Sequence, residues 1–143
     1  SALKITPTPE ALQGLEAYAE DIYFHQVIAR TEKGSLRRYR DLPDALRLAS
    51  EGGTAADREW RIHFHVPLHC APTEQFDTTA DQLQKAIRFL GSTPAVCSHV
   101  EMETYTWEVL PDEMKQRDVV DQLVGEYEWT LARLAKQGIA PKK

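Results

Sequence analysis

The chain has 143 residues, of which 42% are hydrophobic and 27% are charged, as in an ordinary globular domain. This length suits one domain and is well short of the roughly 250 residues of a complete eightfold βα barrel. The net charge of −5 argues against a general nucleic-acid binder, and no apolar run reaches the roughly 20 residues of a membrane span. Two cysteines are too few for a disulfide scaffold. We therefore expect one cytoplasmic domain that neither spans a membrane nor binds nucleic acid.

The N-terminal part of the chain predicts two strands with a helix between them. A short apolar stretch at 2–6 predicts the first strand. Thr8 and Pro9 then have the residue types typical of a helix N-cap and first helical position. Residues 22–29 are rich in β-branched and aromatic side chains, which predicts the second strand.

A turn and a second helix follow the second predicted strand. The turn contains Gly34, and the segment 37–40 after it is strongly basic. Asp41 opens a pattern with apolar residues at helical spacing, and Gly52 ends it. We expect the basic segment to be a loop between the turn and this helix.

The third predicted strand spans 61–66, and a proline stops it. A loop of about ten residues leads to Thr79, which has Gln82 three positions later. This spacing is that of a capping box, so it predicts the start of a third helix. Gly91 is the expected C-cap of that helix.

The C-terminal part predicts a fourth strand at 98–105 and a fourth, longest helix. Asp118 is the expected N-cap of the helix, and Gly138 its expected end. Apolar residues recur through this helix at a spacing that predicts one continuous buried stripe: Val120, Leu123, Val124, Tyr127, Leu131 and Leu134.

Four strands that alternate with four helices predict an α/β fold with a parallel sheet and helices outside it. Residues 1–143 would then form a single (βα)4 segment, which is half of a TIM barrel. The pattern is also compatible with a small open sheet covered by helices. An open half-barrel has two free edges and an uncovered face, so we expect either a missing N-terminal half or a homo-oligomer.

The predicted strands carry polar side chains on one face. His63 and His65 alternate with apolar residues in the third strand, and Glu101 and Glu103 do so in the fourth. One explanation is a sheet with one face in water. The other is a covered polar interior, into which His25, His65 and Glu103 would point from three strands. Two imidazoles and a carboxylate suit a divalent cation such as Mn, Zn or Fe.

Other polar and aromatic residues have both a functional and a structural interpretation. Glu101 could be a catalytic general base, or it could pair with a basic residue. His63, Tyr105 and Trp107 could contact a substrate, or they could pack in the core. Arg38 lies in the basic segment, where it could bind a phosphate or carboxylate or remain in a solvated loop.

Three segments, 22–27, 60–67 and 99–107, together with the stretch 37–43, resemble the closing strands of xylose-isomerase-like TIM barrels. The superfamily contains sugar-phosphate isomerases and epimerases, and within it the segments are most similar to Ebo-type metabolite-traffic proteins. The resemblance implies that the chain is the C-terminal half of a longer barrel. The histidine and last glutamate of the superfamily's metal site would correspond to His65 and Glu103. The aspartate position would fall near His25, and the first strand has no glutamate.

These observations support three functional hypotheses. The first is a metal-dependent isomerase or epimerase acting on a small polyhydroxylated metabolite. The second is a non-catalytic protein that binds or carries a metabolite in a degenerate barrel site. The third is a structural assembly module that binds no ligand.

Overall fold

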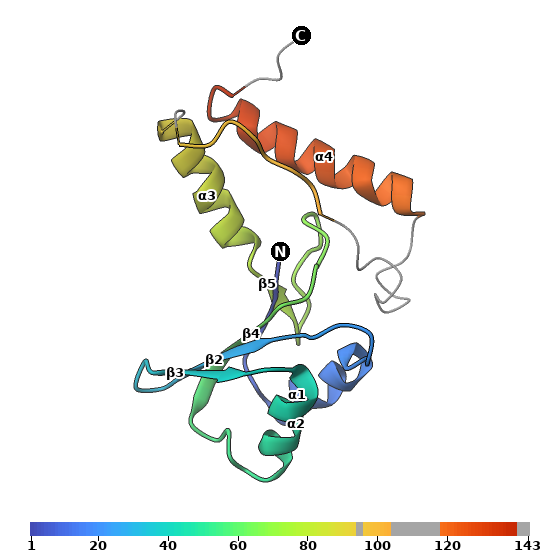
Figure 1. Cartoon of the computed structure of the whole chain (residues 1–143), viewed down its shortest axis with the longest axis vertical. Helices are drawn as coiled ribbons and strands as arrows, with labels where there is room; N and C mark the ends of the chain where they lie inside the picture. Colours follow the sequence, from blue (N-terminus) through green and yellow to red (C-terminus); the bar gives the residue numbers. More distant parts are fainter. Residues whose placement is uncertain (94–95, 104–117, 140–143) are drawn as a thin grey trace.

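The computed structural model describes residues 1–93, 96–103 and 118–139. The strands form one five-stranded sheet in the order β3-β2-β4-β1-β5 (Figure 1). In chain order they are β1 (Leu3–Ile5), β2 (Val27–Thr31), β3 (Leu36–Tyr39), β4 (Asp57–Ile62) and β5 (Asp77–Thr78). The helices are α1 (Pro9–Gly14), the short 3-10 helix η1 (Leu15–Tyr18), α2 (Leu42–Ser50), α3 (Ala80–Ser92) and α4 (Val119–Ala135). Across these residues, no helix has the length and hydropathy needed to cross a membrane.

The sheet is antiparallel, so the prediction of a parallel half TIM barrel is wrong, and with it the expectation of a xylose-isomerase-like barrel. β1 pairs antiparallel with both β4 and β5, and β2 pairs antiparallel with both β3 and β4. The turn between β2 and β3 contains Gly34, whose φ of +82° favours glycine. This turn is too short for a parallel crossover, so β3 returns beside β2 as a hairpin.

Several strand positions also differ from the predicted ones. The second strand begins at Val27, and Phe24 before it is 56% exposed in a loop. The basic segment predicted as a loop contains β3, an edge strand where polar side chains can face water. The third strand ends at Ile62, before the predicted histidines. Of the predicted fourth strand, 98–103 contains no strand and 104–105 lies outside the described residues.

The helix predictions are confirmed in type and in most of their caps. Thr8 caps α1, and Asp118 caps α4 by accepting from the backbone nitrogens of Val120 and Asp121. The capping box at Thr79 is wrong, because the Thr79 hydroxyl accepts from Ala2 N at 2.8 Å. The start of α3 is thereby tied to the first strand.

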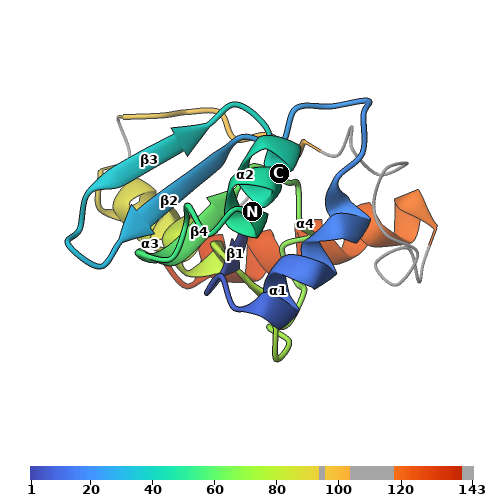
Figure 2. The same ribbon diagram turned by 90° about the horizontal axis from the view of Figure 1, so that it is seen from below.

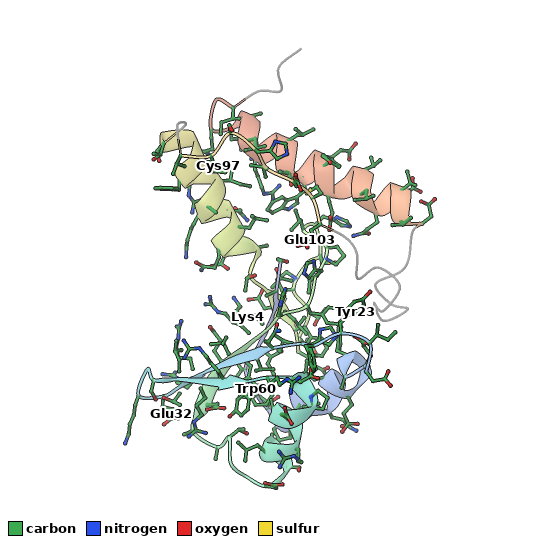
Figure 3. All side chains as sticks on the ribbon, viewed as in Figure 1. Lys4, Tyr23, Glu32, Trp60, Cys97 and Glu103 are labelled. Atoms are coloured by element: carbon green, nitrogen blue, oxygen red, sulfur yellow. The ribbon has the colours of Figure 1, made fainter. Side chains whose placement is uncertain are left out.

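The main hydrophobic core lies between the sheet and helices α1 and α2 (Figures 1 and 2). Figure 3 shows Trp60 of β4 in this layer. Buried side chains of this layer come from both helices and from the inner strands, and they include Leu3, Val27, Leu42 and Trp60. Successive side chains of a strand alternate between faces, so Arg61 lies on the opposite, more polar face. The interpretation of a sheet with one wet face therefore describes the observed sheet.

Helices α3 and α4 pack against each other away from this core (Figure 1). Helix α4 buries the face opposite to the one predicted. Val120, Val124, Tyr127 and Leu131 of its apolar stripe are 42–63% exposed. Two polar residues of the other face, Gln122 and Glu126, are only 5% and 6% exposed. Buried polar side chains normally have hydrogen-bond partners, so this face of α4 should contact polar groups of the protein or of a ligand.

Gly91 lies inside α3, one residue before its end, and holds α3 close to the turn after α4. A Cβ at this position would lie 2.6 Å from Cβ and 3.3 Å from the carbonyl oxygen of Gln137. We expect Gly91→Ala to lower the free energy of unfolding by about 1–3 kcal/mol, because backbone atoms would have to move. Arg88→Ala, on the exposed part of α3, is the control and should change it by less than about 0.5 kcal/mol. Urea unfolding measures both, and equal stabilities would contradict the close contact.

Candidate functional site

A cavity of about 270 Å³ lies beside the α3–α4 pair. One wall comes from the inner face of α3, through Leu83, Ile87 and Leu90. A second comes from α4, and the remaining walls come from the segments 65–68 and 100–103. Figure 3 shows Glu103 on the segment between α4 and the sheet. Most of this lining is hydrocarbon, as in many sites for small organic ligands.

Three polar residues of α4 line the cavity at intervals of one helical turn, namely Gln122, Glu126 and Thr130. Glu126 Oε1 accepts a hydrogen bond from Leu68 N at 3.1 Å. Gln122 Nε2 and Thr130 Oγ1 are buried and have no hydrogen-bond partner among the residues that the structure describes. A buried polar group without a partner costs about 1–3 kcal/mol, so these two atoms would gain from a ligand that pairs with them.

His65 lies on the cavity wall and belongs to a small polar cluster. Its Nε2 is 3.2 Å from His63 Nε2, and the two rings stack with their centroids 5.2 Å apart. On the other side of the pair, His63 Nδ1 lies 2.8 Å from Gln26 Oε1. His65 Nδ1 is 3.4 Å from the Glu103 carbonyl oxygen and 4.0 Å from its carboxylate. His65 and Glu103 are thus neighbours, although neither lies on a strand.

The histidine pair makes stability dependent on pH. Burial, and then the positive charge of His65, lower the pKa of His63 below its usual 6.5, while Glu103 partly opposes them. The unfolded chain therefore binds the proton more readily, and stability falls as the pH drops below about 6.5 through the folded-state pKa.

We expect His63→Gln to lose less stability than the wild type between about pH 7.5 and about pH 5. Glutamine keeps a hydrogen-bonding group but cannot acquire a charge. The control is His69→Gln, which removes an exposed histidine outside the pair. Urea midpoints measured at each pH give the comparison, and identical pH profiles for wild type and His63→Gln would exclude this role.

His25 does not join His65 and Glu103. It is 2% exposed, and both of its ring nitrogens already face acceptors. Its Nε2 lies 2.9 Å from Glu20 Oε1, and its Nδ1 lies 3.0 Å from the carbonyl oxygen of His63. Both nitrogens are already engaged within the protein, so His25 connects the loop before β2 to the end of β4.

The predicted divalent-metal site of His25, His65 and Glu103 is therefore not assembled. Within residues 1–93, 96–103 and 118–139, no group of three or more His, Cys, Asp or Glu side chains could hold a metal ion. The physical reason is the shifted register. His25 precedes β2 and His65 follows β4, whereas the prediction placed both on paired strands.

The remaining predicted site residues are dispersed. Glu101 lines the cavity, but its carboxylate is exposed and lies 2.9 Å from His99 Nε2. Arg38 is exposed on the edge strand β3, opposite Ile28, and is not part of the cavity. Tyr105 and Trp107 lie outside the described residues.

The sequence analysis missed Gln122, Glu126 and Thr130. Their spacing of four residues was a usable signal, since it puts three polar side chains on one face of a helix. The apolar stripe of the same helix was the stronger pattern, and it favoured the opposite face as the buried one. Only the observed packing shows which face of α4 is inside.

Comparisons with protein-family models, curated proteins and solved structures find no match to this chain. The cavity and the side chains around it are therefore the best indication of function.

Proposed function

We propose that this protein binds a small organic molecule without transforming it, in the cavity beside α3 and α4. The observation that carries this proposal is the burial of Gln122 and Glu126, at 5% and 6% exposure, on the wall of a mainly apolar cavity. Apolar walls with a few polar groups at one end suit a ligand with a hydrocarbon body and a polar head. This is the second hypothesis of the sequence analysis, a protein that binds or carries a metabolite. The binding site now lies between the helices and not on the polar face of the sheet.

The arrangement of the titratable groups supports binding rather than catalysis. Glu101 is paired with His99 in water, and His25 is held by two acceptors in the interior. The His63–His65 pair is closer to the cavity, but His65 already contacts His63 and Glu103.

The test uses 1-hexanol as a probe, because it combines a short hydrocarbon chain with one hydroxyl group. We expect saturable binding, with NMR shift changes concentrated on the methyl groups of Ile87, Leu90 and Leu134 around the cavity. A protein that shows no saturable change at these methyl groups would contradict the proposal.

A matched pair of variants tests whether hexanol binds inside the cavity. Ala86→Phe adds a bulky ring at a residue that lines the cavity, and it should abolish hexanol binding. Lys85→Phe adds the same ring at the neighbouring exposed position, which does not line the cavity, and should leave binding unchanged. Equal binding by the two variants would place the probe elsewhere on the protein.

A further inference from the structure

The charge balance of the cavity is unusual. Glu126 is a buried carboxylate that accepts a hydrogen bond from the backbone nitrogen of Leu68. Among the described residues, no side chain of Lys, Arg or His forms an ion pair with it within 4.0 Å. A buried charge is normally paired, because removing it from water without compensation is costly. The cavity thus has a position for a cation.

The other groups around the cavity do not fill that position. Glu101 and Glu103 also line it and add to its negative potential. The Ser1 amino group donates to Val66 O at 3.1 Å, and it forms no ion pair with Glu126 within 4.0 Å among the described residues. Glu126 attracts it, but burial has the larger effect and lowers its pKa. His65, the histidine on the wall, contacts His63 and Glu103. A positively charged ligand would therefore be favoured over a neutral or negatively charged one.

The neighbours of Glu126 on α4 set a second requirement. The unpaired Gln122 Nε2 is a donor, so a ligand atom near it should be an acceptor such as a hydroxyl or carbonyl oxygen. Thr130 Oγ1, on the other side of Glu126, can donate or accept. A ligand with an oxygen close to its amine would satisfy both kinds of group.

The rest of the lining restricts the body of the ligand. Leu83, Ile87 and Leu90 face it from α3, and Val66 and Met102 from the connecting segments. A polyhydroxylated sugar would leave most of its hydroxyl groups against hydrocarbon, at a cost for each unpaired group. A compact alkyl or aromatic body would gain from the burial instead.

We propose that the ligand is a small amine with an apolar body, whose ammonium group pairs with Glu126. This inference rests on the proposed binding function and specifies its ligand class. The ammonium donates to the carboxylate, and the hydrocarbon body lies against α3. Binding of an amine by a buried carboxylate is charge-assisted, and such hydrogen bonds are about twice as strong as neutral ones.

Three probes with the same six-carbon chain test the head group, namely n-hexylamine, 1-hexanol and hexanoate. At neutral pH we expect hexylamine to bind at least about tenfold more tightly than hexanol, and hexanoate to bind most weakly. Binding of hexanol with no preference for hexylamine would overturn the amine proposal and leave the binding function intact. Failure of all three probes would overturn the binding function itself.

Glu126→Gln is the decisive variant, because the amide keeps the shape of the side chain and removes its charge. It should lose the preference for hexylamine and retain hexanol binding, which also shows that the cavity has formed. Glu103→Gln removes an exposed carboxylate at the edge of the cavity and should retain most of the preference. If Glu126→Gln binds hexanol and still prefers hexylamine, Glu126 is not the counter-ion.

Discussion

Replacement of Trp60 by alanine is expected to lower the free energy of unfolding by about 3–5 kcal/mol. The Trp60 side chain is fully buried at the centre of β4, which pairs with β1 on one side and β2 on the other. Its indole nitrogen donates to Asp57 Oδ2 at 2.9 Å, and Tyr39 packs beside the ring. The substitution would leave a large void and a buried carboxylate oxygen without its donor.

Urea unfolding followed by far-ultraviolet circular dichroism measures this loss. Small domains have only about 5–15 kcal/mol of stability, so Trp60→Ala could unfold the protein. Trp60→Phe is a milder variant, and its free energy of unfolding should lie between those of the wild type and Trp60→Ala. Leu36→Ala removes an apolar side chain that is half exposed on β3, and it is the matched control. A Trp60→Ala protein no less stable than the Leu36→Ala protein would contradict the observed core.

Replacement of His25 by alanine is expected to cost about 2–5 kcal/mol, the second-largest effect. The change would remove a buried ring that contacts Phe64 at a centroid distance of 4.7 Å. It would also leave the Glu20 carboxylate and the His63 carbonyl without the partner that now joins them.

His63→Ala is the control for this prediction, because His63 directly precedes the buried Phe64 and is itself exposed. We expect its loss of stability at neutral pH to be much smaller than that of His25→Ala. Equal losses would mean that burial of the His25 ring and its two contacts contribute little. The comparison separates a structural histidine from a surface one by the same assay.

The sequence predicted the helices well because their ends are marked by local chemistry. Thr8 and Asp118 accept hydrogen bonds from the first turn of their helices wherever those helices pack. Thr79 shows the limit of this reasoning. Its hydroxyl accepts a hydrogen bond from Ala2 N, which is distant in the sequence, instead of capping the helix. A local sequence pattern cannot reveal such a partner.

Strand direction could not be predicted in the same way. The alternation of strands and helices suggested parallel crossovers, but β3 is a polar strand that the pattern did not reveal. Once β2 turns back at Gly34, an antiparallel sheet follows. The alternating polarity around Arg61 and His63 correctly indicated a sheet with one face in water. The prediction instead assumed that helices cover both faces.

The candidate site was predicted only in part. His65 and Glu103 do lie close together, because the segment after β4 and the segment after α3 both line the cavity. The cavity could not be predicted, because it depends on which face α4 turns inward. Gln122 and Glu126 are ordinary surface residue types, and only their burial in the packed structure distinguishes them.

The division of the apolar interior has a consequence for motion. Among the described residues, the cluster that joins the sheet to α1 and α2 contains no side chain of α3 or α4. These two helices have fewer buried contacts, so they should open locally at a lower free energy than the strands. Amide hydrogens of α4 should then exchange with deuterium well before those of β2 and β4. A bound molecule would slow that exchange by holding the helices closed.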